Sequence, residues 1–386
     1  MNRFLKKYWK WCGLLIAVVI VSNCTQPLSL KNMAYDEPGY YMFGKIPQRS
    51  FYSDITVGQV IEKWNNETSG SQSTSSIVIY NNTLFVGDLS GRVYGFDRHT
   101  GVLSGFEKNS GSVEVAPVVN NLRIFFVLNE RYENYSTFRV FDFINGKTLH
   151  EEEIEGSVPN ELIRLNDGII VLTDRGELIK FNFAGYREWS TQTKKTSLSS
   201  PASDGDVIIF GNQAGELLIV SVKTGEINSK TKFNYAITGG LSIENGNAYF
   251  ADETGALYSF NIKNKKVNWT ANTGTKILST PVMDDSKIYI GNLGGNLFAF
   301  DKNNGKKIWE ISTLGVINTT PLITRNMIIQ PDVNKKVYFL NSSDGEIEKT
   351  LAFERRTKLN PVFYDSLLYL GSDRGIIHAY YVYGNN

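Results

Sequence analysis

The sequence contains little cysteine and little histidine. Among its 386 residues the cysteines are Cys12 and Cys24, and the histidines are His99, His150 and His378. Cys12 lies inside an apolar N-terminal run, so a mature chain would keep Cys24 alone, which cannot form an intramolecular disulfide. The histidines occupy unrelated positions of the repeats described below, so a metal site would need other ligands. We therefore expect neither a disulfide scaffold nor a metal site.

The net charge is also close to zero. The formal net charge is +1, and without Arg3, Lys6, Lys7 and Lys10 the remainder is 1 − 4 = −3. This balance offers no electrostatic footprint for nucleic acid. The apolar run that follows these cations, from Trp11 to Val21, has eleven residues, whereas a helix that spans a bilayer needs about 20.

Residues 1–23 predict a lipoprotein signal peptide. Basic residues, the short apolar run and Val21-Ser22-Asn23 precede Cys24, as in the bacterial signal that ends at a lipidated cysteine, although Asn23 is less usual there than Gly or Ala. The alternative is an ordinary signal peptide cut nearby, which would leave Cys24 as a free thiol. A lone cysteine in an exported chain favours lipidation. Residues 24–55 show no sustained periodicity, and we expect them to form a flexible tether.

Residues 56–386 are dominated by a unit of about forty residues. In its clearest copy, Ile288 to Glu310, apolar residues alternate with others on both sides of a Gly294-Gly295 turn, which indicates a hairpin of half-buried strands. The turn glycine recurs at positions 91, 176, 215, 255, 295 and 375, with a lysine at 335. The intervals are 85, 39, 40, 40, 40 and 40, and the first contains a divergent copy. The chain therefore has eight repeats.

Tryptophans mark the fourth strand of a repeat and show how a ring could close. Trp189, Trp269 and Trp309 occupy the same point of that strand, and Trp64 lies in a similar strand, Val60 to Glu67, that no earlier strands precede. The last repeat ends after three strands. We predict an all-β fold, an eight-bladed β-propeller of four-stranded antiparallel blades in which the N-terminal strand completes the C-terminal blade. We expect the four tryptophans to dock between adjacent blades.

One repeat carries a family resemblance. The unit from Ala299 to Trp309 resembles the AxDxxTGxxxW repeat of pyrroloquinoline-quinone-type (PQQ-like) propellers and departs from it at Asn304. Together with Cys24, the whole chain resembles the outer-membrane assembly lipoproteins of the BamB family. The resemblance implies a non-enzymatic scaffold, lipid-anchored in the outer membrane and facing the periplasm, that docks as a monomeric propeller onto the β-barrel insertase complex. No local motif carries the family's contact residues over to this chain.

Two other functions remain open. One is a periplasmic propeller that binds another protein or a glycan, and the other is a quinoprotein dehydrogenase. Enzymes of that type hold PQQ and Ca²⁺ with a carboxylate cluster and usually a pair of adjacent cysteines, and the mature chain has one cysteine. No G-x-S-x-G elbow is present either. We therefore expect no catalytic residue, no cofactor and no metal.

The divergent second repeat has a longer hairpin loop, Asn129 to Thr137. It contains Arg131, Tyr132 and Tyr135, and arginine and tyrosine are enriched where proteins bind each other. The loop is thus a candidate for partner binding. The alternative is tolerated variation in loop length, which is common at protein surfaces.

Overall fold

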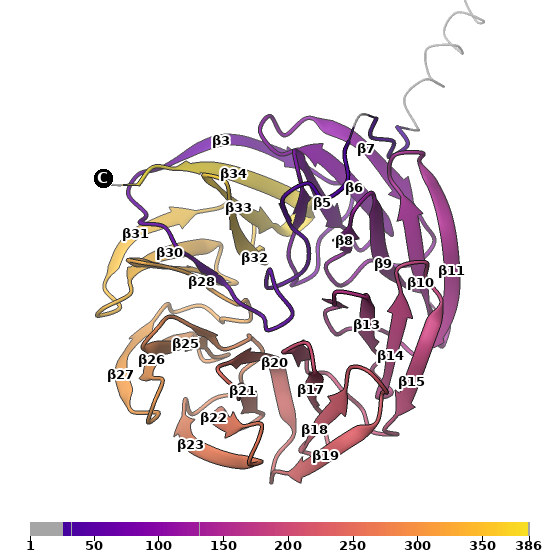
Figure 1. Cartoon of the computed structure of the whole chain (residues 1–386). Helices are drawn as coiled ribbons and strands as arrows, with labels where there is room; N and C mark the ends of the chain where they lie inside the picture. The colour runs from indigo at the N-terminus through magenta and orange to yellow at the C-terminus, as the bar shows by residue number, and fades with distance from the viewer. Residues whose placement is uncertain (1–25, 32, 131, 385–386) are drawn as a thin grey trace, which may run out of the picture.

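Eight antiparallel sheets form a ring. The computed structural model describes residues 26–384 apart from 32 and 131, and its strands lie in eight sheets around a central axis (Figure 1). This confirms the predicted eight-bladed, all-β propeller. In the described part of the chain the only helical element is a turn of 3₁₀ helix, η1 (Asp373–Gly375). No helix there is long or apolar enough to cross a membrane.

The blades follow one another in chain order, and the innermost strand comes first in each. Blades 1 to 4 comprise β4 (Val78–Tyr80), β5 (Thr83–Gly87), β6 (Arg92–Asp97) and β7 (Leu103–Lys108); β8 (Val118–Asn120), β9 (Arg123–Asn129), β10 (Tyr135–Asp142) and β11 (Lys147–Glu155); β12 (Ile163–Arg164), β13 (Gly168–Leu172), β14 (Glu177–Asn182) and β15 (Arg187–Gln192); and β16 (Ala202–Ser203), β17 (Val207–Gly211), β18 (Glu216–Ser221) and β19 (Ile227–Lys232). Blades 5 to 8 comprise β20 (Ile237–Glu244), β21 (Asn247–Asp252), β22 (Ala256–Asn261) and β23 (Lys266–Asn272); β24 (Val282–Met283), β25 (Lys287–Gly291), β26 (Asn296–Asp301) and β27 (Lys307–Ser312); β28 (Leu322–Thr324), β29 (Met327–Pro331), β30 (Lys336–Asn341) and β31 (Ile347–Ala352); and β32 (Thr357–Tyr364), β33 (Leu367–Ser372), β34 (Ile376–Val382) and β3 (Val60–Glu67).

The place of a strand in its blade decides its sequence pattern. Strand β26 has four buried residues in succession, Leu297 to Phe300, because neighbouring blades cover both faces of a middle strand. In the outer strand β27 only Trp309 is buried. The hairpin between β25 and β26 needs a residue with positive φ, and Gly295 supplies it at 82°. In blade 6 the middle strand therefore reads as a continuous apolar run, and the outer strand as a polar strand with one large buried apolar residue.

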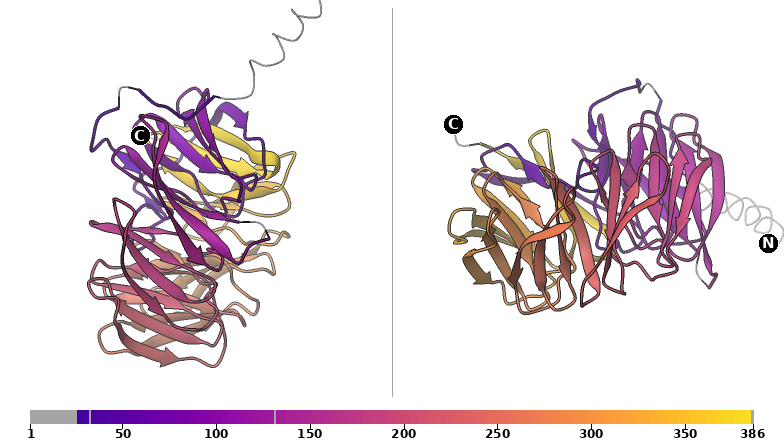
Figure 2. Two further views of the ribbon diagram at one scale, coloured as in Figure 1. Left: turned by 90° about the vertical axis from the view of Figure 1, so that its right-hand side faces the viewer. Right: turned by 60° about the horizontal axis from the view of Figure 1, so that its bottom comes forward.

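The ring closes as predicted. Strand β3 pairs antiparallel with β34, and Trp64 lies opposite Ala379 in the register. Both figures show the indigo start of the propeller beside its yellow end (Figures 1 and 2). Strand β3 thus covers the edge of β34, whose backbone groups would otherwise be unpaired and open to another chain.

The N-terminal strap, residues 26–55, packs onto the ring. Its strand β1 (Gly39–Tyr40) pairs with β4, and β2 (Tyr52–Ser53) runs parallel to β28. Leu28, Tyr40 and Phe51 are buried. The prediction of a flexible tether over residues 24–55 is therefore wrong for the described residues of the strap. Its contacts reach several blades at irregular intervals, so no sequence period reveals them. The predicted signal peptide, 1–23, and Cys24 lie outside the described residues.

Candidate functional site

The ring has two unlike faces. Because each blade has four antiparallel strands, the hairpin between its second and third strands and the connection to the next blade lie on one face, here called the hairpin face. In blade 6 these are joined by a hydrogen bond from Thr313 N to Gly295 O at 2.8 Å. The opposite face carries the strap and is called the strap face. The two faces are therefore distinct surfaces for binding.

The strap closes the channel at the strap face. Backbone N–H groups of the innermost strands donate to its carbonyls at 2.9–3.0 Å: Val119 to Tyr41, Ser203 to Pro47, Ile243 to Gln48, Ile323 to Phe51 and Arg325 to Ile55. These donors belong to blades 2, 4, 5 and 7 or their turns. Figure 1 shows the indigo strap running across the middle of the ring. It satisfies inner strand edges that would otherwise face an open channel.

Arg49 fixes the strap inside the ring. Its side chain is 1% exposed, and its guanidinium donates to four carbonyl oxygens: Pro201 at 3.0 Å, Phe43 at 2.7 Å, Glu161 at 2.8 Å and Leu162 at 3.1 Å. Burial lowers the pKa of the guanidinium to about 10, so it remains charged at neutral pH. The planar donor fork of arginine suits this arrangement, which a point charge would not reproduce.

Polar residues from successive blades form a chain of hydrogen bonds around the channel. Thr280 N donates to Thr320 Oγ1 at 3.0 Å, and Thr320 N donates to Asn360 Oδ1 at 2.6 Å. Asn360 N then donates to Ser75 O at 2.8 Å, which crosses the closure of the ring. Each of these bonds joins neighbouring blades at or just before their inner strands, so the set holds the blades together at the axis.

Glu161 extends this chain on the other side of Ser75. Its Oε1 accepts from Ser75 Oγ at 2.6 Å and its Oε2 accepts from Ala116 N at 2.9 Å, while its own N–H donates to Ser200 Oγ at 3.0 Å. Burial raises the pKa of the Glu161 carboxyl to about 7, against the lowering effect of these bonds and of nearby Arg49. One carboxylate therefore ties three blades together in an environment that disfavours its charge.

Glu161 should make stability depend on pH. Its pKa rises from the ordinary value of 4.5 to about 7 on folding, so its stabilising contribution is present below pH 4.5 and is lost as the pH rises through 7. We expect the free energy of unfolding of the wild type, relative to Glu161→Gln, to fall between pH 5 and pH 8.5 in urea titrations. The exposed Glu354→Gln is the control and should follow the wild type. Parallel curves for wild type and Glu161→Gln would contradict the prediction.

A cavity of about 230 Å³ lies in the channel between Phe43 of the strap and residues of the hairpin face. Of its lining residues only Glu161 carries a carboxylate, and both oxygens of that group already accept hydrogen bonds. No group of three or more His, Cys, Asp or Glu side chains in the described residues could hold a metal ion. The lining therefore does not fit a site for PQQ and Ca²⁺, which needs a carboxylate cluster.

Each of the four tryptophans packs against a turn glycine of the next blade. A Cβ atom on that glycine would lie 2.5–2.8 Å from the indole, so only glycine allows this approach. The pairs are Trp64 with Gly101, Trp189 with Gly225, Trp269 with Gly305 and Trp309 with Gly345.

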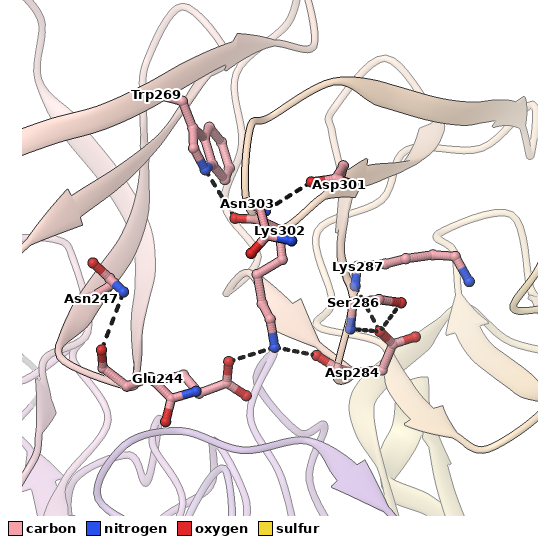
Figure 3. Close-up of polar contacts among 10 residues, drawn as sticks. Glu244, Asn247, Trp269, Asp284, Ser286, Lys287, Asp301, Lys302 and Asn303 are labelled. Atoms are coloured by element: carbon pink, nitrogen blue, oxygen red, sulfur yellow. Dashed lines mark hydrogen bonds and ion pairs between the residues drawn. The ribbon is translucent and has the colours of Figure 1, made fainter.

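The indole N–H usually donates to the same turn. Trp269 Nε1 donates to Lys302 O at 3.0 Å, and the Lys302 ammonium donates at 2.7 Å to Glu244 Oε2 and to the Asp284 carbonyl (Figure 3). Trp309 differs, because its Nε1 has no partner in the described part of the chain. The equivalent carbonyl, of Ser342, instead accepts from Tyr289 and Lys287.

Substitution of Gly305 tests this packing. Gly305 has φ 71°, and an added Cβ would lie 2.5 Å from the Trp269 ring. Gly246 has φ 73° but nothing within 4 Å of an added Cβ. We expect Gly305→Ala to lower the free energy of unfolding by about 3 kcal/mol and the control Gly246→Ala by about 1 kcal/mol. Equal losses in urea unfolding would show that the contact with tryptophan contributes nothing.

The long loop of blade 2 lies on the hairpin face. Tyr132 is fully exposed with φ 70°, whereas Tyr135 begins β10 and is half-buried. Arg131 lies outside the described residues. Asn134 O accepts from Gly156 N at 2.8 Å, which ties the loop to the connection that leads to blade 3. The structure thus exposes Tyr132 on a surface that a partner could reach.

The sequence of the blades decides the family. Residues 56–271 and 269–382 match the family model described as outer membrane protein assembly factor BamB. The chain belongs to this family. No curated protein matches the chain in sequence.

Solved structures share the fold of this BamB-family chain. BamB from Moraxella catarrhalis superposes with a TM-score of 0.72 and 16% identity, covering 84% of this chain and 100% of that one. Quinohemoprotein alcohol dehydrogenase from Comamonas testosteroni gives 0.73 and 11%, covering 90% and 81%. The computationally designed Ika8 protein gives 0.71 and 14%, covering 83% and 100%. BamB, an alcohol dehydrogenase and a designed protein thus share this fold, which alone does not assign an activity.

Several residues that shape the channel of this BamB-family propeller were missed from sequence. Arg49 and the strap precede residue 56, where the family match begins, and no sequence signal marks them. Ser200, Thr280, Thr320 and Asn360 could have been found, because they recur at intervals of 80, 40 and 40 and each directly precedes a proline. Proline holds the residue before it extended, which suits the start of an inner strand.

Proposed function

We propose that this chain is a non-enzymatic scaffold for the assembly of outer-membrane β-barrel proteins. It is anchored to the outer membrane through a lipid on Cys24, faces the periplasm, and binds the β-barrel insertase complex as one propeller. Membership of the BamB family supports the assembly role. The observation that carries the scaffold assignment is the occupied channel, with Arg49 and the strap filling one end.

The geometry favours protein contact over catalysis. The channel lining offers one carboxylate, which is already bonded to Ser75 and Ala116, whereas the hairpin face presents exposed apolar tips such as Leu314 and Tyr132. Exposed side chains on rigidly held loops are typical of binding surfaces. The surface of the ring, and not its interior, is therefore the proposed functional part.

Binding can be measured with purified components. The chain from residue 24 onward, with Cys24 replaced by Ser for solubility, is titrated by calorimetry with the purified soluble domains of the β-barrel insertase of the same bacterium. We expect a complex of one chain with one insertase. Failure to bind would overturn the assembly role. A spectral change and a rise in Tm on adding PQQ and Ca²⁺ would instead assign a quinoprotein enzyme.

The anchor needs its own test. In cells, the full-length chain is expected in the outer-membrane fraction, and Cys24→Ser is expected in the soluble periplasmic fraction. Labelled palmitate should be incorporated into the wild type and not into the variant. A Cys24→Ser protein that remained in the membrane would remove the lipid anchor from the proposal.

A further inference from the structure

Leu314 is placed unfavourably for folding. It forms the tip of the connection between blades 6 and 7, where it is 85% exposed with φ 63°. The equivalent tip between blades 5 and 6 is Gly274, with φ 78° and open space around it. A single exposed leucine needs no explanation, but a leucine held in the left-handed region strains the backbone where glycine closes the same turn without strain.

Lys335, at the neighbouring tip, is also a non-glycine residue held in the left-handed region. It has φ 65° at a hairpin position that Gly295 and Gly255 occupy in blades 6 and 5. The two tips touch, since Asn334 Nδ2 donates to Leu314 O at 2.9 Å and Val333 N donates to Val316 O at 3.0 Å. Two adjacent turns of the hairpin face therefore carry side chains where the equivalent turns of blade 5 carry Gly255 and Gly274.

The surface around these tips is apolar at its centre and cationic at one side. Val316 is 38% exposed beside Leu314. Lys335 O accepts a hydrogen bond from Phe353 N at 2.8 Å. The exposed loop that contains Arg355 therefore lies beside the Lys335 tip. Arg356 forms an ion pair with Asp373, whereas Lys335 and Arg355 have no ion-pair partner in the described part of the chain. Two cations are therefore available to a partner.

We propose that Leu314, Val316, Lys335 and Arg355, the Leu314 surface, dock an acidic protein surface whose apolar pocket receives Leu314. The inference rests on the proposed function, because it assigns that surface to the soluble domains of the insertase. Burial of Leu314 and Val316 removes apolar area from water. Lys335 and Arg355 attract the acidic rim and raise the rate of association in a salt-dependent way.

The decisive variant is Leu314→Gly. It removes the side chain and relieves the backbone, so the Tm should equal or exceed that of the wild type while the affinity for the purified soluble domains of the insertase falls at least tenfold. Lys194→Gly is the matched control: it occupies the equivalent tip between blades 3 and 4 with φ 56°, and it should bind as the wild type does. Lys335→Glu should slow association, and the wild-type rate should fall as NaCl is raised.

Each outcome decides between the two proposals. Wild-type binding that Leu314→Gly leaves unchanged would overturn the Leu314 surface and keep the assembly role. No binding by the wild type would overturn the assembly role and, with it, the partner assigned to this surface. Self-association of the wild type that Leu314→Gly abolishes, measured by analytical ultracentrifugation, would assign the surface to a second copy and overturn the acidic partner.

Discussion

Arg49→Ala is expected to lower the free energy of unfolding by about 3–5 kcal/mol, because four buried carbonyls lose a charged donor. One of these carbonyls, that of Phe43, belongs to the strap itself. The others belong to Glu161 and Leu162, just before the inner strand of blade 3, and to Pro201, just before the inner strand of blade 4. The strap should also loosen before the ring unfolds, since the other described cations of the strap, Lys31 and Lys45, are exposed. Urea unfolding and trypsin cleavage after the exposed Lys45 would measure the two effects.

Two further variants separate charge from geometry at Arg49. Arg49→Lys keeps a cation but cannot reach carbonyls on both sides at once, so we expect it to retain only part of the lost stability. Lys45→Ala changes an exposed strap residue that also has positive φ, and it should match the wild type. If Arg49→Ala unfolded at the wild-type urea concentration, the guanidinium would not hold the strap.

Trp309→Ala is expected to lower the free energy of unfolding by about 3–5 kcal/mol. The indole is 9% exposed and lies between β27 and the Gly345 turn of blade 7, so its loss opens a cavity between two blades. The expected loss can be measured by urea unfolding. A loss below 1 kcal/mol would mean that blades 6 and 7 are held together elsewhere.

Replacement by phenylalanine distinguishes packing from hydrogen bonding. Trp269 and Trp309 are 8% and 9% exposed, but only Trp269 donates its N–H to a carbonyl, that of Lys302. Trp269→Phe should therefore cost about 1 kcal/mol more than Trp309→Phe, which removes an unpaired buried donor. The same urea experiment would reveal the difference, and the reverse order would contradict the assigned bonding.

The ring could be predicted because its signals are local and repeated. Turn glycines such as Gly255 and Gly295 report a backbone conformation, and tryptophans such as Trp269 and Trp309 report a contact that each blade makes with the next. Both the glycine and the tryptophan recur at the forty-residue interval of the blades. The unpaired strand around Trp64 then specified the closure, since a fourth strand was missing from the last blade and present before the first.

The strap and the channel could not be predicted in the same way. Tyr41, Pro47 and Gln48 bind the ring through their backbone carbonyls, which every residue possesses. Arg49 is one arginine among many in sequence, and its burial follows from carbonyls contributed by segments 112 and 152 residues away. Side-chain identity carries no information about either contact, so the sequence of residues 24–55 predicts a tether where the structure has a packed strap.

Under the proposed lipid anchor, the packed strap would limit the distance between the propeller and the membrane. Leu28 N already donates to Phe106 O on the outer strand β7 of blade 1 at 3.2 Å. From Cys24 to the first described residue, Gln26, the chain spans two residues, which reach about 7 Å when extended. If Cys24 carries the lipid proposed above, the anchor therefore lies close to the outer edge of blade 1, and blade 5, on the opposite side of the ring, lies farthest from it.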